Sequence, residues 1–360
     1  MAIHNEYKNL FEVKIYNLKK KFKKKFFNNF INKLSMHHYK NCVQYRQILN
    51  NLNFNINKKN YELKDYPTIP VSLFKFLDLY SVNKKKIVKK ILSSGTTNKN
   101  LSKINLDKLN SNNQVKALNN ILKNLLGTRR LPMLIVEKDP RNDHKINFNA
   151  KVAAILGFSL FGKDHCYILD KEGKLDFNLL KKFYNKFSNE KFFIFGFTSS
   201  IFKHLIKNPS FKKNKYNLKN GILLHGGGWK KLEEIKVNNN RFKELLIKKF
   251  NLRSVFNYYG MVEQTGSIFI EGKNCGYLHT SIYSDILIRD KDFNLLEKNK
   301  KGIVQLFSIL PSSYPGHNIL TEDIGELKGE DDCKCGLKGK YFLIHGRIKE
   351  AEIRGCSDVR

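Results

Sequence analysis

Short apolar runs alternate with longer amphipathic segments through the middle of the chain. The apolar runs have the length of buried strands, and the segments between them place apolar residues three or four positions apart, as on one face of a helix. The strands predicted in this way cover residues 131–137, 167–170, 192–197, 222–225 and 254–258. The predicted helices cover residues 150–158, 177–187, 200–206 and 241–250. This alternation predicts an α/β fold with a largely parallel sheet.

The pattern changes after residue 280. Apolar runs at 286–289, 303–310 and 340–345 follow one another with no helical segment between them, which predicts a small antiparallel, barrel-like annex. The sequence contains no internal repeat. We expect one large domain over 61–345, preceded by a basic helical region over 1–60 and followed by a tail over 346–360.

The basic N-terminal region has phenylalanines at helical spacing, at Phe22, Phe26, Phe27 and Phe30. They predict an amphipathic helix, for which two roles are open. The helix packs on the main domain, or residues 19–30 contact a membrane that supplies a lipid substrate. We favour packing, because membrane binding needs a stronger and more sustained amphipathic pattern.

The 360 residues carry a formal net charge of +34. The excess is mostly lysine spread along the chain without a known nucleic-acid-binding module, so we expect a diffuse solvated surface and no specific nucleic acid partner. The sequence has neither an apolar run of transmembrane length nor the apolar core of a signal peptide, which predicts a cytoplasmic protein. Six cysteines are too few for a disulfide scaffold and are expected as thiols.

A candidate phosphate loop lies at Ser93, Ser94, Gly95, Thr96 and Thr97. Glycine permits a tight bend with outward-facing N–H groups, and hydroxyls beside it complete a concave donor surface for phosphate oxygens. An ordinary Ser/Thr/Gly turn is the alternative.

Two further stretches follow predicted strands, where ligands of open α/β sheets bind. In the first, Tyr259 and Gly260 precede Glu263; the ring is suited to stacking on a base and the carboxylate to holding Mg²⁺. In the second, Gly227 and Gly228 lie in a glycine-rich loop that a planar ligand can approach closely, next to the single tryptophan. The alternative for the first stretch is a strand-to-helix turn in which the acid caps the helix. The alternative for the second stretch is a flexible loop.

The C-terminal part adds acidic, basic and thiol candidates. Asp323 lies beside a predicted turn, where a carboxylate can accept both ribose hydroxyls, and Arg347 follows a strand and can meet a ribose or phosphate. Cys333 and Cys335 would supply half of a zinc site, but the sequence offers no second pair nearby. Cys356, beside arginine, is a candidate nucleophile for an activated acyl group.

Taken together and in this order, the motifs resemble the adenylate-forming superfamily of acyl-CoA synthetases. The resemblance is closer to the LuxE-type acyl-protein synthetases, also called long-chain-fatty-acid–luciferin-component ligases. It extends from about residue 60 to residue 360. It rests on the motifs at 93–97, 195–198, 225–231, 259–264 and 354–358.

The resemblance implies that ATP and a fatty acid form an acyl-adenylate, and that the acyl group passes to Cys356 and then to a partner acyl reductase. By position, Ser93–Thr97 would hold the phosphates, Glu263 would bind Mg²⁺, Tyr259 would face adenine, and Asp323 with Arg347 would meet the ribose.

The chain departs from the superfamily at Asn98, Asn100 and Glu322. The chain also ends after residues 346–355, which resemble the hinge stretch of the superfamily. The resemblance therefore implies a truncated C-terminal domain. Lys103, Lys349 or Arg354 would take the place of the lysine that this domain supplies in the superfamily. Two rival interpretations stay open. The first is an acyl- or aryl-CoA ligase of the phenylacetate-CoA ligase type, and the second is a non-catalytic protein that binds nucleic acid or anionic lipid.

Overall fold

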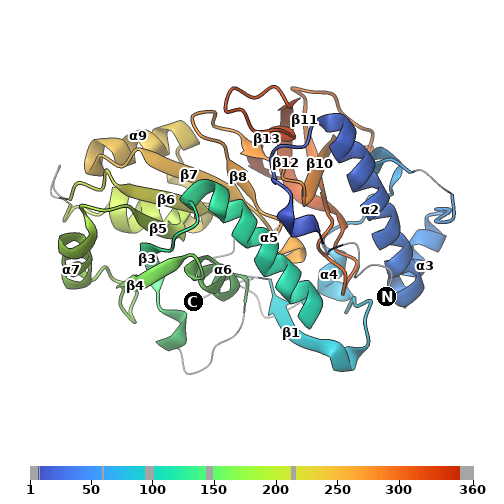
Figure 1. Ribbon diagram of the computed structural model, residues 1–360, viewed down its shortest axis with the longest axis horizontal. Helices are drawn as coiled ribbons and strands as arrows, with labels where there is room; N and C mark the ends of the chain where they lie inside the picture. The colour runs from blue at the N-terminus through green and yellow to red at the C-terminus, as the bar shows by residue number, and fades with distance from the viewer. Residues whose placement is uncertain are drawn as a thin grey trace. The chain divides into compact units, whose positions relative to one another are not determined.

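In a computed structural model, five parallel strands, six antiparallel strands and a separate two-stranded hairpin organise the described residues (Figure 1). The model describes residues 7, 9–58, 61–93, 101–142, 149–211 and 216–348. The described chain divides into two units, which we treat separately. The first unit combines residues up to 93 with 101–121 and 260–348, and the second unit spans 122–259. The predicted domain limits at residues 60 and 345 stay predictions.

The second unit contains the parallel sheet. Its strands run in the order β7-β6-β5-β3-β4, and neighbouring strands are parallel. Each predicted strand of this region is present, as β3 (Leu131–Lys138), β4 (Gly162–Leu169), β5 (Phe192–Phe197), β6 (Gly221–Gly226) and β7 (Ser254–Tyr259). Only β4 begins well before its predicted start. It lies at the edge of the sheet, where its early polar residues face solvent.

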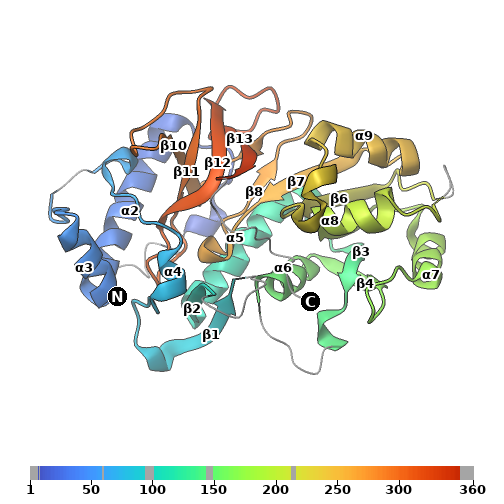
Figure 2. The same ribbon diagram turned by 180° about the vertical axis from the view of Figure 1, so that it is seen from behind.

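Helices cover both faces of this sheet. The predicted helices correspond to α6 (Ala150–Ser159), α7 (Phe177–Phe187), α8 (Thr198–Ile201) with a π-helical turn η5 (Phe202–Ile206), and α9 (Asn239–Phe250). Phe192 and Ile194 pack into one core with α7 and α9. The alternate residue Phe195 instead meets Phe158 of α6, with ring centroids 4.5 Å apart. The strand period of two therefore assigns successive phenylalanines to opposite faces, and α6 lies across the strands from α9 (Figures 1 and 2).

In the first unit the antiparallel strands form a sheet ordered β10-β11-β12-β13-β9-β8. The strands are β8 (Phe269–Glu271), β9 (Leu278–His279), β10 (Ser284–Arg289), β11 (Lys301–Ser308), β12 (Asn318–Glu330) and β13 (Lys340–Arg347). The prediction of antiparallel strands in this region is confirmed. Among the described residues they make an open sheet rather than a small barrel.

One local prediction was wrong: the stretch around Asp323 is the middle of β12 and not a turn. Gly325 makes this possible, because a Cβ there would lie 2.5 Å from Val304 Cγ2 and 3.0 Å from the Leu343 carbonyl oxygen. The missing side chain lets β11 and β13 approach β12 from both sides.

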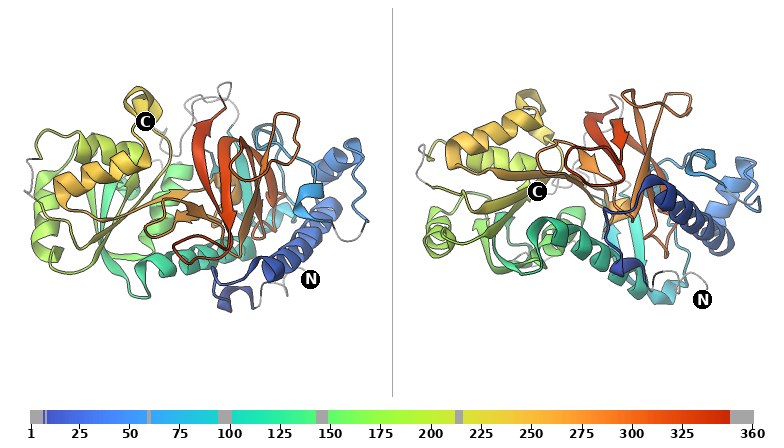
Figure 3. Two further views of the ribbon diagram at one scale, coloured as in Figure 1. Left: turned by 90° about the horizontal axis from the view of Figure 1, so that it is seen from above. Right: turned by 45° about the horizontal axis from the view of Figure 1, so that its top comes forward.

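The basic N-terminal segment forms α2 (Lys20–Asn41), followed by α3 (Val43–Asn51). Phe27 and Phe30 are buried and Phe22 is exposed, so the apolar face of α2 packs within the first unit, beside the antiparallel strands (Figures 2 and 3). Lys23 is buried as well, and its Nζ donates to Thr280 Oγ1 at 2.8 Å. Packing of the predicted helix is confirmed, and membrane contact by residues 19–30 stays a prediction.

A hairpin of β1 (Ile87–Leu92) and β2 (Lys103–Asp107) leads into α5 (Lys108–Leu126). Ile121 and Leu122 of this helix are buried. The remaining described elements are short: η1 (Leu10–Glu12), η2 (Leu63–Asp65), α4 (Leu73–Phe76), η3 (Lys84–Lys86), η4 (Pro140–Asn142), η6 (Lys230–Ile235) and η7 (Val262–Gln264). Among the described helices, none combines the length and the apolar character needed to cross a bilayer.

Candidate active site

The candidate phosphate loop is the connection of the β1–β2 hairpin. Ser93 and Ser102 close its base: the Ser93 N–H donates to the Ser102 carbonyl at 3.0 Å, and the Ser102 N–H donates to Ser93 Oγ at 2.9 Å. Ser94, Gly95, Thr96 and Thr97 lie outside the described residues. The ends of the loop are thus fixed by paired strands and two hydrogen bonds, and the Ser93 hydroxyl is used at the base.

Glu263 lies in the 3₁₀ turn η7 and is only 6% exposed. Burial raises the pKa of its carboxyl above the usual value, while a hydrogen bond with the Ser102 side chain and the positive charge of Arg347 partly counter the rise. Negatively charged Glu322 adds to it. The charged form of a buried carboxylate is costly when few groups offset the lost hydration, and a cation beside it stabilises that form.

The turn that carries Glu263 is held from the loop between β11 and β12. The Tyr314 hydroxyl donates to the Glu263 carbonyl at 2.9 Å, and Gln264 Nε2 donates to the carbonyl oxygens of Gly316 (2.9 Å) and Leu306 (3.2 Å). Gln264 and Tyr314 are buried, so these bonds are shielded from water and fix the backbone of the motif.

Asp323 and Arg347 form an ion pair across β12 and β13. They are register partners, and Arg347 Nε lies 3.5 Å from Asp323 Oδ1. The Asp323 side chain is 14% exposed and that of Arg347 36%. The Asp323 N–H donates to Thr321 Oγ1 at 3.1 Å, which fixes the carboxylate's own backbone.

Arg347 links this pair to Glu263, because its charge acts on both carboxyl groups. The first unit therefore brings together the base of the hairpin, Glu263, Asp323 and Arg347, which are widely separated in sequence. Sequence reasoning missed Ser102, Gln264 and Tyr314. Gln264 belongs to the motif at 259–264. The sequence carries no signal that Ser102 and Tyr314 lie near Glu263.

In the second unit, two predicted stretches end neighbouring strands at the same edge. Gly226 of β6 pairs with Tyr258 of β7 and with Phe197 of β5. Gly227 and Gly228, just beyond, are exposed, and Gly227 has a φ of +80°. A planar ligand can therefore approach this backbone from the carboxyl ends of the strands, beside the residues that lead into Tyr259 and Gly260.

The side chain of Trp229 does not face a ligand at the glycine-rich loop. It is buried in the core of the second unit, with its ring centroid 4.8 Å from that of Phe202 and 6.1 Å from that of Phe242. His225 is buried too, its Nδ1 lies 3.0 Å from Thr198 Oγ1, and burial lowers its pKa to about 3. Both side chains therefore support the glycine-rich loop from beneath.

The remaining predictions for this site fall elsewhere. Cys356 lies outside the described residues, as do Lys349 and Arg354, whereas Lys103 is exposed at the start of β2. The five cysteines of the described chain are free thiols: Cys42, Cys166, Cys275, Cys333 and Cys335.

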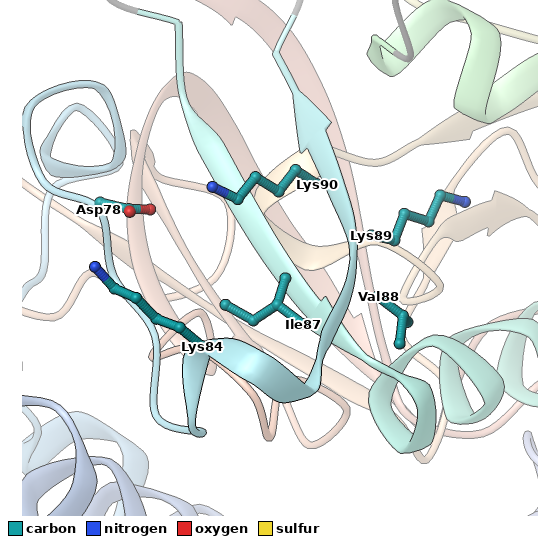
Figure 4. Close-up of a pocket in the computed structure, with 6 residues that line it drawn as sticks. All are labelled: Asp78, Lys84, Ile87, Val88, Lys89 and Lys90. Carbon is teal, nitrogen blue, oxygen red and sulfur yellow. The ribbon is translucent and has the colours of Figure 1, made fainter.

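A hollow of about 240 Å³ lies beside β1. It is lined by Asp78, Lys84, Ile87, Val88, Lys89 and Lys90. The ammonium groups of Lys89 and Lys90 point in opposite directions (Figure 4). The lysines therefore do not converge on one anion, and we assign no function to this hollow.

The fold matches solved structures of an adenylate-forming ligase. An open conformation of 2-hydroxyisobutyryl-CoA ligase, in complex with 2-HIB-AMP and CoA, aligns with a TM-score of 0.68 at 14% identity, over 92% of this chain and 71% of that chain. Its postadenylation state aligns with a TM-score of 0.65 at 12% identity, over 92% and 69%. The predicted fold class, an adenylate-forming α/β fold with a mixed, largely parallel sheet, is confirmed.

Within that fold class, the family model for the acyl-protein synthetase LuxE matches residues 4–360. The chain belongs to this family. It is 24% identical to a long-chain-fatty-acid–luciferin-component ligase of Aliivibrio fischeri, over 89% of this chain and 84% of that protein. It is 22% identical to one of Vibrio harveyi, over 89% and 83%. The predicted family is confirmed.

Proposed function

We propose that this protein is an ATP-dependent fatty acyl-protein synthetase. It activates a fatty acid as the acyl-adenylate and then transfers the acyl group to the thiol of Cys356. A partner protein, an acyl reductase, receives it from there. Membership of the acyl-protein synthetase family and the adenylate-forming fold support the first half of this proposal.

The observation that carries the proposal is the convergence on Glu263. This buried carboxylate contacts Ser102 at the base of the candidate phosphate loop and is influenced by Arg347, the partner of Asp323. The candidate phosphate loop and the pair of Asp323 and Arg347 thus lie near the motif of Glu263. The Glu263 carboxyl is buried, and a bound cation would stabilise its charged form. Carboxylate and hydroxyl oxygens are donors that Mg²⁺ prefers, so Glu263 fits the role of its ligand.

In the adenylation step, a carboxylate oxygen of the fatty acid attacks the α-phosphorus of ATP, and pyrophosphate leaves with the electron pair of the broken bond. Mg²⁺ held at Glu263 would neutralise charge on the phosphates. Ser93–Thr97 would bind phosphate oxygens, Asp323 would accept the ribose hydroxyls, and Arg347 would orient that carboxylate. Tyr259, with Gly227, Gly228 and Gly260, would border the adenine.

In the transfer step, the Cys356 thiolate attacks the acyl carbon and AMP leaves with the electron pair, which forms a thioester. The thiol proton passes to solvent. Adenylation makes this step favourable because AMP is a good leaving group and a thiolate is an effective nucleophile. The second transfer, to a thiol of the partner reductase, exchanges one thioester for another.

The test is acylation of the protein itself. Full-length protein is incubated with ATP, Mg²⁺ and a radiolabelled long-chain fatty acid, without CoA. We expect fatty-acid-dependent ATP–pyrophosphate exchange and a protein-bound label that hydroxylamine releases. Cys356→Ser should keep the exchange and lose the label, whereas the control Cys166→Ser should keep both.

Two outcomes would overturn parts of the proposal. If label appears only as acyl-CoA and only when CoA is added, the protein is an acyl-CoA ligase. The name of the structurally similar 2-hydroxyisobutyryl-CoA ligase states this type of reaction for that protein. If neither exchange nor label is seen with fatty acids of any chain length, the adenylation step itself is wrong.

A further inference from the structure

Four metal-ligating side chains come together in the first unit, away from the candidate active site. They are Cys275, His279, Cys333 and Cys335, and their ligand atoms all lie within 4.8 Å of one another. His279 Nε2 lies 3.5 Å from Cys275 Sγ and 3.3 Å from Cys335 Sγ, and the sulfurs of Cys333 and Cys335 are 3.4 Å apart. The sequence-based expectation that no second pair stands near Cys333 and Cys335 was therefore wrong.

The fold explains this convergence. Cys275 lies in the loop between β8 and β9, His279 ends β9, and the other two cysteines lie in the loop between β12 and β13. β9 and β13 are antiparallel, and His279 pairs with Tyr341 at the start of β13, so the register brings the imidazole to the β12–β13 loop that carries Cys333 and Cys335. The His279 ring also stacks on Tyr341, with centroids 5.6 Å apart, and this contact fixes its direction.

The two loops share a local design. Cys275 and Cys335 are each followed by a glycine with positive φ, Gly276 at +79° and Gly336 at +82°. In the first loop, the Tyr277 N–H donates to Cys275 Sγ at 3.4 Å. In the second, the Gly336 N–H donates to the Cys333 carbonyl at 2.9 Å. The first turn thus directs a backbone N–H at the sulfur of Cys275, and the second closes the backbone between the two cysteines of its loop.

Gly272 leaves space among the ligand atoms. A Cβ at this position would lie 2.8 Å from Cys275 Sγ, 2.8 Å from Cys335 Sγ and 2.9 Å from His279 Nε2. Three of the four ligand atoms therefore pack against the Gly272 backbone, where a side chain would not fit. Tetrahedral ligands about 2.0–2.3 Å from zinc lie roughly 3.3–3.8 Å from one another, which is close to the 3.3–3.5 Å between the neighbouring ligand atoms here.

We propose that these four side chains bind one Zn²⁺ ion in a tetrahedral Cys₃His site that joins the β8–β9 loop to the β12–β13 loop. Three sulfurs and one imidazole nitrogen are a ligand set of closed structural zinc sites. Binding displaces the three thiol protons to solvent. The four ligands fill the coordination sphere, so the ion has no open position for catalysis.

The position of the site suggests what the ion does. The ligand loops lie at one end of β12 and β13, and the same strands carry Asp323 and Arg347. Joining the loops restrains the start of β13 against β9 and thereby the register of the sheet. The role is structural, so it does not depend on the proposed acyl transfer.

Metal content tests the proposal directly. Full-length protein, purified without chelator and without a metal-affinity tag, should contain about one zinc per chain by elemental analysis, as expected for a closed site. Cobalt(II) added to protein stripped under reducing conditions should give the strong visible bands of tetrahedral coordination and a thiolate charge-transfer band. Absence of both zinc and the cobalt spectrum in folded wild-type protein overturns the proposal.

Variants separate this site from other thiols. Cys275→Ser and Cys335→Ser should lose the zinc and the thiolate band, and Cys166→Ser should keep both. Gly272→Ala removes no ligand but fills the space between them, and should also lose the metal, whereas Gly127→Ala, with open space around it, should not. If the cysteine variants fail to fold, the wild-type cobalt spectrum still decides. A Cys333–Cys335 disulfide found by mass spectrometry in freshly purified protein would contradict the proposal.

Discussion

Arg347 Nε lies 3.5 Å from Asp323 Oδ1, and the two residues face each other across the β12–β13 ladder. Burial raises the pKa of Glu263, and the charge of Arg347 partly counters that rise. One guanidinium thus supports two carboxylates that the proposed mechanism assigns to different parts of ATP. The ladder fixes the distance between Arg347 and Asp323.

Replacing Arg347 tests this relationship. In Arg347→Ala, Asp323 loses its partner and Glu263 loses a stabilising charge. Ion pairs at this degree of exposure contribute about 0.2–1 kcal/mol, so we expect the KM for ATP in the pyrophosphate-exchange assay to rise by up to about fivefold. Asp292→Asn, at an exposed turn position, is the control. An unchanged KM for ATP in Arg347→Ala would remove the pair from the nucleotide site.

Ser102 should tune the ionisation of Glu263. Burial raises the pKa of the Glu263 carboxyl and the hydrogen bond from Ser102 partly counters that rise, so Ser102→Ala should raise the pKa further. If ionised Glu263 holds Mg²⁺, the acid limb of the pH profile of kcat/KM moves to higher pH. Ser159→Ala, whose hydroxyl bonds a helix carbonyl, should leave the profile in place. A shift toward lower pH would contradict the assigned hydrogen bond.

Asp285 and Lys340 form a buried ion pair with Oδ1 and Nζ 2.9 Å apart, close to buried Lys23. Burial alone would raise the pKa of Asp285, but Lys340 and Lys23 outweigh it and hold the pKa below its usual value. The pair therefore stabilises the fold above the unfolded-state pKa, near 4, and this contribution is lost as the pH falls through the lower folded-state pKa.

We expect Asp285→Asn to lower the free energy of unfolding by about 3–5 kcal/mol at pH 7, because it leaves a buried charge uncompensated. Urea unfolding measures the change, and the difference between variant and wild type should shrink at acid pH. Glu172→Gln breaks an exposed pair with Lys174 and should cost less than about 1 kcal/mol. Equal losses of unfolding free energy in the two variants would show that the buried pair stabilises the fold no more than an exposed pair does.

Gly226 is required by the close approach of β7. A Cβ there would lie 2.5 Å from Tyr258 Cε1 and 2.6 Å from the Tyr258 carbonyl oxygen. We expect Gly226→Ala to destabilise the protein by about 1–3 kcal/mol, as overpacking does. Thermal unfolding provides the measurement, with Gly127→Ala as the control that introduces a side chain at positive φ without a clash. A smaller loss in Gly226→Ala than in the control would contradict the predicted clash.

The local sequence was sufficient for the elements of the second unit. The helix predicted over 177–187 has the bounds observed for α7, and β5 was predicted to the residue. These elements have strong apolar patterns, because α7 buries one helix face and β5 buries both strand faces. The motif residues Glu263, Asp323 and Arg347, selected from a family resemblance, lie in one region of the first unit, and their roles stay predictions.

The strand β12 shows where local reasoning failed. Its residues 318–330 include two glycines and several acidic side chains, a composition typical of turns. They form a strand because β11 and β13 pair with both of its edges and the glycines admit close neighbours. Strand pairing is a property of the partners as much as of the segment itself.

The sequence by itself determined the class of fold, the family and the identity of the chemical groups, because periodicity and motif spacing are local properties of the chain. Only the tertiary structure decided which groups meet. It placed Ser102 and Arg347 beside Glu263, it put Trp229 in the core, and it assembled Cys275 and His279 with Cys333 and Cys335. Contacts between distant residues depend on strand order and register, which hydrophobic burial and backbone hydrogen bonding settle for the whole sheet at once.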